Sequence, residues 1–164
     1  MTAQRQERKG WRPTMALIWL LAATAPAMVA QAATTERVVV NRHTGLAIGG
    51  FDPVAYFTDH EATMGDGQFE ASARGAVWRF RNADNRAFFL ARPDIYAPQF
   101  GGYDPVDVAR GVTVAGNALV WLVVGQRLYL FGREQSRDAF AADPERYLRA
   151  AARQWPLLLS TLAE

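Results

Sequence analysis

The feature that most constrains the fold of this chain is an internal repeat. Residues 49–54, Gly-Gly-Phe-Asp-Pro-Val, return 52 positions later as residues 101–106, Gly-Gly-Tyr-Asp-Pro-Val. Residues 78–96 and 129–147 share six identities in 19 positions, where average residue usage gives about one. The identities are Phe80/Phe131, Arg86/Arg137, Phe89/Phe140, Ala91/Ala142, Pro93/Pro144 and Tyr96/Tyr147. A repeat decides the architecture, so we expect two similar units, at about residues 46–100 and 101–153.

Each unit is expected to hold a β-hairpin followed by a helix, which predicts an α+β fold with both units packed as one compact domain. Short alternating runs flank two-residue turns that contain glycine, Arg74-Gly75 and Gly125-Gln126, and this pattern is typical of hairpins. The predicted strands are 69–73, 76–80, 119–124 and 127–131. Asn82 is a good N-cap for the helix after the first hairpin.

The rest of the chain gives shorter elements. Val38–Val40 reads as a leader strand within residues 33–45, and Tyr56-Phe57 as the start of an extended segment. After Asp104-Pro105 we expect a short helix over 106–110, and after the second hairpin helices over 134–142 and 144–154. Pro156 should break the last one, leaving a separate short helix within residues 156–164.

The first 32 residues resemble an export signal. Four basic residues precede an 11-residue apolar run from Met15 to Ala25, and Ala30-Gln31-Ala32 is a small-x-small cleavage pattern. These features predict a secretory signal peptide cleaved after Ala32, with the mature protein periplasmic or secreted. A retained N-terminal anchor is the alternative, although the run is shorter than the ~20 residues of a spanning helix.

Charge and cysteine content exclude several functions. The chain has 18 Lys and Arg and 16 Asp and Glu. Residues 1–32 hold four of the basic residues and one acid, so residues 33–164 carry 14 against 15, a net charge of −1. No basic surface is left to favour nucleic acid or, after signal cleavage, an anionic membrane. The chain has no cysteine, which excludes thiol redox chemistry and thiolate ligands.

Four sequence stretches resemble the YHS domain family, in its exported bacterial, tandem-repeat form, over about residues 46–155. They are the Gly-Gly-Phe-Asp-Pro-Val-Ala-Tyr-Phe opening at 49–57, the aromatic and proline pattern from Trp78 to Tyr96, residues 96–103, and residues 128–131. The resemblance implies a small binding or accessory domain. Family members that bear thiols are associated with metals. Their cysteine positions here hold Ala55, Arg81, Asn85, Asp104, Asp107, Gly132 and Ser136.

Candidate metal ligands are therefore carboxylates and histidine. Asp52, Asp104 and Asp107 would form a hard-cation site if they converged. Asp52 and Asp104 each precede a proline, however, and Asp in that position more commonly caps a turn or helix. Asp107 is predicted to lie on the surface of a helix. His60 lies in the Asp59-His60-Glu61 cluster, whose neighbours point to opposite faces of an extended chain.

Other polar residues give weaker evidence for a functional site. His43 lies in a turn, and no Ser, Cys or second His is spaced from it as a nucleophile–base pair requires. Arg86 and Arg137 repeat at one helical position, where an anion site competes with a structural ion pair.

These observations predict a small exported, non-enzymatic YHS-like domain that binds an unknown protein or small molecule. No catalytic or cofactor-binding residue is assigned and no cofactor is expected. The alternative is a periplasmic metal-binding or metal-sensing protein that takes a divalent ion through Asp52, His60, Asp104 or Asp107.

Overall fold

The two hairpins of this protein share one register pattern. The structure, a computed structural model, describes residues 36–162, which belong to a single compact unit, Ala32–Glu164. Strands β1 (Asp66–Ala73) and β2 (Ala76–Phe80) pair antiparallel, as do β3 (Asn117–Val124) and β4 (Arg127–Phe131). Both hairpins have a bulge near the start of the first strand, and both turns have positive φ at both residues, as a type I′ turn requires.

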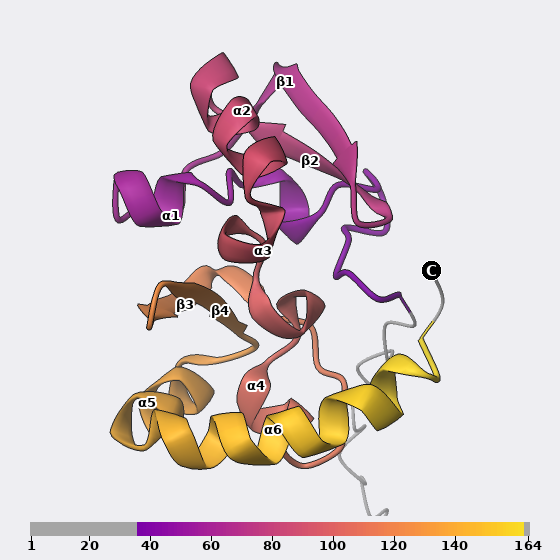
Figure 1. Cartoon of the computed structure of the whole chain (residues 1–164), viewed down its shortest axis with the longest axis vertical. Helices are drawn as coiled ribbons and strands as arrows, with labels where there is room; N and C mark the ends of the chain where they lie inside the picture. Colours follow the sequence, from indigo (N-terminus) through magenta and orange to yellow (C-terminus); the bar gives the residue numbers. More distant parts are fainter. Residues whose placement is uncertain (1–35, 163–164) are drawn as a thin grey trace, which may run out of the picture. The chain divides into compact units, whose positions relative to one another are not determined.

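Helices surround these hairpins in an order that occurs twice (Figure 1). The first run is η1 (Ile48–Gly50), α1 (Ala55–Thr58), the first hairpin, α2 (Ala83–Ala91) and α3 (Pro93–Tyr96). The second is η2 (Gln99–Gly102), α4 (Pro105–Val108), the second hairpin, α5 (Glu134–Ala142) and α6 (Pro144–Leu159). The α+β class is confirmed. That the two runs form similar units stays a prediction, which the recurring order and register support.

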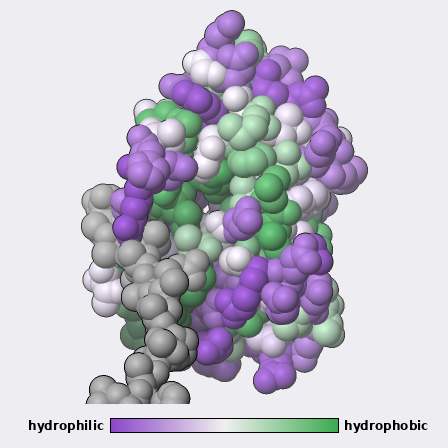
Figure 2. All heavy atoms as spheres, turned by 180° about the vertical axis from the view of Figure 1, so that it is seen from behind, coloured by the Kyte–Doolittle hydropathy of each residue, from purple (hydrophilic) through white to green (hydrophobic). Residues whose placement is uncertain are grey.

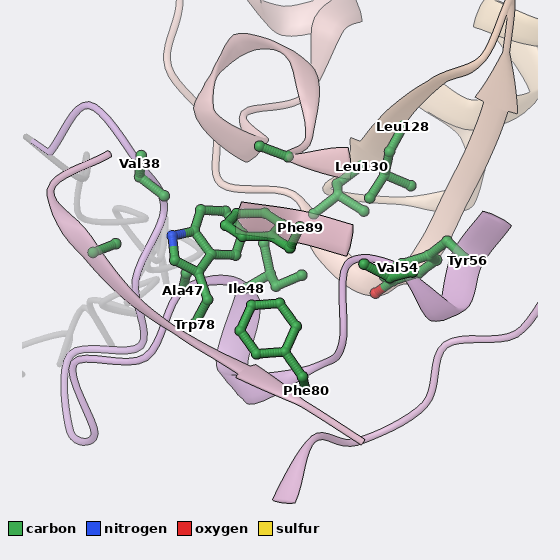
Figure 3. Packing of buried hydrophobic residues seen from close by; sticks show 12 residues of the cluster. Val38, Ala47, Ile48, Val54, Tyr56, Trp78, Phe80, Phe89, Leu128 and Leu130 are labelled. Carbon is green, nitrogen blue, oxygen red and sulfur yellow. The ribbon is translucent and has the colours of Figure 1, made fainter. Parts of the chain in front are cut away.

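The core joins residues from both runs. One cluster packs Trp78, Phe80 and Phe89 with Leu128 and Leu130 of β4 (Figure 3). A second cluster is built under α5 around Phe131 and Phe140, and a third under α6. Phe89 and Phe140 both face their hairpins, as the repeat pattern predicts. Strand β4 contributes to two clusters: the core of the first run includes Leu128 and Leu130 of the second, whereas the cluster under α5 is built from the second run alone.

Local sequence explains several helix boundaries. The Asn82 side chain accepts a hydrogen bond of 2.8 Å from the Asn85 N–H and caps α2 as expected. The helix predicted over 134–142 is α5, with the same bounds. Pro93 and Pro144 each stand at the start of a helix, where their missing N–H costs nothing.

Residues 55–58 differ from the extended segment expected there. They form α1 because Asp52 Oδ1 accepts a hydrogen bond of 2.8 Å from the Val54 N–H and closes a helical turn.

The expected leader strand is also wrong where the structure describes it. Val38–Val40 is not a strand, and Val40 forms only an isolated bridge with Ala47. The backbone of Val39 bonds in two directions: its N–H donates to the Gly101 carbonyl and its carbonyl accepts from the Ile48 N–H. The expected signal peptide, residues 1–32, and the start of the leader, residues 33–35, lie outside the described residues.

The break predicted at Pro156 does not occur, and no separate short helix begins there. Helix α6 continues from Pro144 to Leu159 with Pro156 inside it. Ala151, Trp155 and Leu158 pack into one core cluster, at a spacing of four and three residues that keeps them on one helical face, and Leu162 beyond the end of the helix joins them. This packing outweighs the missing N–H of an exposed proline.

Candidate functional site

The carboxylate of Asp52 is buried, and both of its oxygens accept hydrogen bonds from the protein. Its Oδ1 accepts from the Val54 N–H, and its Oδ2 accepts from the Arg81 N–H over 2.8 Å and from the Asn85 side-chain amide over 2.7 Å. The side chain thus ties the start of α1 to the junction between β2 and α2. Three donors on one carboxylate leave little lone-pair capacity for another ligand.

Asp104 repeats this arrangement 52 residues later with one donor fewer. Its Oδ1 accepts from the Val106 N–H and its Oδ2 from the Gly132 N–H, each over 2.9 Å. Burial raises the pKa of the Asp104 carboxyl, and the nearby charge of Asp107 adds to this, although the two backbone hydrogen bonds and the neighbouring Ser136 hydroxyl oppose it. Asp104 is therefore the N-cap of α4, as one of its two predicted roles requires.

Asp107 is buried, which corrects its expected place on the surface. Only 3% of the residue is exposed, and its carboxylate pairs with Arg133 and Arg110, each at 3.0 Å. The hydrogen bond from Arg133 to Asp107 raises the pKa of that arginine. The two guanidinium groups balance the charge of the carboxylate, so Asp107 acts as an anchor between α4 and the start of α5.

The predicted metal ligands do not form a metal centre. Among residues 36–162 no group of three or more His, Asp or Glu side chains is placed to hold an ion. Asp104 and Asp107 interact electrostatically, whereas Asp52 bonds within the first run. His60 is exposed in a left-handed backbone conformation, and its neighbour Asp59 forms an ion pair with Arg81.

The remaining candidates lie apart. His43 is exposed in a turn, where its backbone N–H donates to the Asn41 side chain. Arg137 forms an ion pair with the adjacent Asp138, in line with the structural role weighed for it. Arg86 is half-buried on α2.

Tyr56 connects the two runs. Its hydroxyl donates a hydrogen bond of 2.9 Å to the Ala118 carbonyl, and its ring meets Trp121 edge-on. Burial raises the pKa of Tyr56 above its ordinary value of 10.0, so the phenol stays protonated and serves as a structural donor.

A hollow that the sequence did not indicate lies beside the N-terminal segment. The larger part has a volume of about 560 Å³ and is lined by residues 36–38, Val40, Gly45, Arg74 and Gly75. A smaller part of about 260 Å³ shares Arg37, Val38 and Arg74 and adds Trp78, Trp155 and the Ala97-Pro98 corner. The hollow thus brings Arg74 to aromatic and aliphatic walls. Hydrophobic side chains are also exposed elsewhere on the protein, as the green areas of Figure 2 show.

Arg74 reaches this hollow at a conformational cost. It is the first residue of the β1–β2 turn and has φ of 55°, a left-handed conformation that Gly, Asn and Asp adopt far more readily. The corresponding turn position in the second hairpin is Gly125. A strained residue at a concave site points to a role for its side chain.

The sequence held one signal for this site, and it was missed. Arg-Gly is an unusual pair for a type I′ turn, where Asn-Gly or Gly-Gly is preferred, so the arginine itself marks the turn as a candidate site. The sequence does not place Arg37 and Trp155 near Arg74, because only the folding of the whole chain brings these three residues together.

Comparisons with known proteins found no family model, no curated protein and no solved structure that matches this chain. The resemblance to the YHS family therefore stays a prediction. Within residues 36–162 no helix has the length and hydrophobicity needed to cross a bilayer.

Proposed function

We propose that this protein is a small exported, non-enzymatic binding domain of the YHS type, and that it holds an anionic small molecule with an apolar body. The observation that carries the proposal is the hollow in which Arg74 lines both parts, beside Trp78 and Trp155 in the smaller one. Export rests on the pattern of the first 32 residues, and the family on the four stretches described above.

The chemistry of the hollow supports a ligand of this class. Guanidinium groups recognise carboxylate, sulfonate and phosphate through paired N–H donors, and small-molecule sites combine apolar walls with a few polar groups. The Trp78 indole N–H already donates to the Ala73 carbonyl over 2.8 Å, so Trp78 offers a ring surface only. Glu36 also lines the larger part, which disfavours anions there and places the anionic end near the wall that both parts share.

The buried carboxylates support a binding role over a metal site or a catalytic one. Asp52, Asp104 and Asp107 each bond to backbone N–H groups or to arginine. None of the three lines the hollow. The alternative of a divalent metal held by Asp and His gains no support from these contacts.

The test uses anilinonaphthalene sulfonate, an aromatic sulfonate that has both features of the proposed ligand. We expect one molecule to bind per chain, with displacement by benzoate but not by neutral benzamide. Arg74→Asn should weaken binding at least tenfold while the melting temperature rises, because Asn suits the left-handed turn better than Arg.

Arg92→Ala is the matched control, since Arg92 is an exposed arginine outside the hollow. It should leave probe binding unchanged. Binding that is equally strong in Arg74→Asn and the unmodified protein, or displacement by benzamide as readily as by benzoate, would refute the proposal.

A further inference from the structure

Strand β3 is packed on both faces but paired on one edge only. Trp121 and Val123 pack toward the core cluster of the first hairpin, whereas Val120, Leu122 and Val124 pack toward α5. Figure 1 shows the β3–β4 hairpin between α1 and α5. A strand covered on both faces is normally an inner strand of a sheet. Here the sheet has two strands, and among the described residues only β4 pairs with β3.

The free edge can be located by residue. Val124 and Arg127 flank the two-residue turn and form the first pair of the ladder, so Val124 and Leu122 direct their backbone groups to β4 and the alternate residues direct theirs away. The outward groups are the N–H and C=O of Trp121 and Val123. No backbone hydrogen bond to either residue from outside the hairpin occurs within residues 36–162.

The composition of β3 removes the usual protection of such an edge. Its sequence, Asn-Ala-Leu-Val-Trp-Leu-Val-Val, has no charge and no proline, and exposed edges are normally blunted by charges, proline or short length. Residues 120–124 are all half-buried whichever face they belong to, which fits exposure along the edge. Leu119, at the start of the run, is 63% exposed.

Strand β1 provides the internal comparison. It has the same length and the same pairing register as β3. Its alternate residues Gln68, Glu70 and Ser72, however, are polar and exposed. Asp66 adds a second acid. Two copies of β1 would bring like charges together, which is unfavourable across a strand pair. Two copies of β3 would not.

We propose that the free edge of β3 binds a second copy of this chain, so that two β3 strands pair antiparallel and join the hairpins into one four-stranded sheet. The strand is compatible with itself because it is uncharged, and the net charge of −1 over residues 33–164 gives little repulsion between copies. Such a contact is isologous, the commonest symmetry of dimers.

The outward groups fix the register around the twofold axis. Trp121 of each copy lies opposite Val123 of the other and exchanges both backbone hydrogen bonds with it. Leu122 then faces Leu122 across the axis in a non-hydrogen-bonded pair, where Cα atoms lie about 4.5 Å apart. That separation is within the range of a disulfide.

The first test is the mass of the purified full-length protein by light scattering and sedimentation over a range of concentrations. We expect a dimer. Val123→Pro removes the outward N–H without touching the ladder to β4 and should weaken dimerisation at least tenfold. Ser72→Pro makes the same change on the edge of β1 and should leave the dimer intact. A protein that stays monomeric at about 100 µM, within the concentration range where exposed strand edges associate, would overturn the proposal.

The second test does not depend on the fold tolerating proline. Because the chain has no cysteine, one introduced thiol reports one contact. Leu122→Cys should form a disulfide-linked dimer on mild oxidation. Residue 119 is more exposed, but in the proposed register it lies far from residue 119 of the other copy. Leu119→Cys should therefore form the disulfide several-fold more slowly. The reverse order would overturn the register, and equal slow reaction of both would overturn the interface, leaving the edge to a strand of another protein.

Discussion

Asn85 donates a side-chain hydrogen bond of 2.7 Å to the buried carboxylate of Asp52, and the residue at the corresponding place in the second run, Ser136, gives Asp104 weaker support. The Ser136 hydroxyl lies near enough to lower the pKa of Asp104, yet its oxygen is buried with no partner at hydrogen-bond geometry. The two carboxylates therefore occupy equivalent turns with unequal support. Since a buried charge depends on its donors, the second turn is the weaker of the two.

This difference predicts unequal results for two truncations to alanine. Asn85→Ala should lower the free energy of unfolding by about 1–3 kcal/mol, because it removes a donor from a buried carboxylate. Ser136→Ala should change it by less than about 0.5 kcal/mol, since the hydroxyl it removes makes no well-formed hydrogen bond. Urea denaturation of both variants measures this directly, and equal losses would contradict the unequal roles.

The pH dependence of stability tests the raised pKa of Asp104. Burial holds the pKa of Asp104 in the folded state above its ordinary value of 3.8. Between pH 3.8 and that folded pKa, the folded state therefore binds more protons than the unfolded state. The contribution of Asp104 is then largest below pH 3.8 and is lost as pH rises through the folded pKa. Asp104→Asn removes this titration. The unfolding free energy of the unmodified protein minus that of Asp104→Asn should fall as pH rises from about 3 to 6.

A difference that grows with pH would mean that hydrogen bonds to the ionised form outweigh burial at Asp104. The side-chain amide introduced by Asp104→Asn cannot accept from both the Val106 and the Gly132 N–H groups, which the carboxylate does. A loss of stability in this variant at every pH is therefore expected. It does not bear on the sign of the pH dependence.

Pro156 offers a stabilising substitution. It lies inside α6 with its side chain exposed, so alanine there adds the missing N–H without disturbing the packed face. Pro156→Ala should raise the free energy of unfolding by about 1–3 kcal/mol. Pro144→Ala, at the first position of the same helix, should bring no such gain, because proline suits that position. Thermal melts of both variants compare them, and destabilisation by Pro156→Ala would mean that a bend at residue 156 is needed for packing.

Local signals in the sequence predicted much of the fold. The turn pairs located both hairpins, Asn82 located α2, and Pro105 and Pro144 located the starts of α4 and α6. These features depend on neighbours within a few residues. The α+β class followed from them and from the repeat.

What the sequence did not reveal depends on distant contacts. Asp107 is an acid on a short helix, and nothing nearby in the sequence shows that Arg133, 26 residues later, pairs with it. The continuation of α6 through Pro156 depends on a core cluster that includes Val39 and Tyr103. The hollow at Arg74 likewise requires residues from both ends of the described chain.

The N-terminal segment is held by the middle of the chain. The Val39 N–H donates to the Gly101 carbonyl, and the Tyr103 hydroxyl donates to the Glu36 carbonyl, 67 residues away. A Cβ atom at Gly101 would lie 2.0 Å from the Arg37 carbonyl oxygen, so only glycine permits this approach. Contacts of such sequence separation form late, because a long loop must close first. Because the N-terminal segment is synthesised first, it can complete the wall of the hollow only after the second run has followed and folded against it.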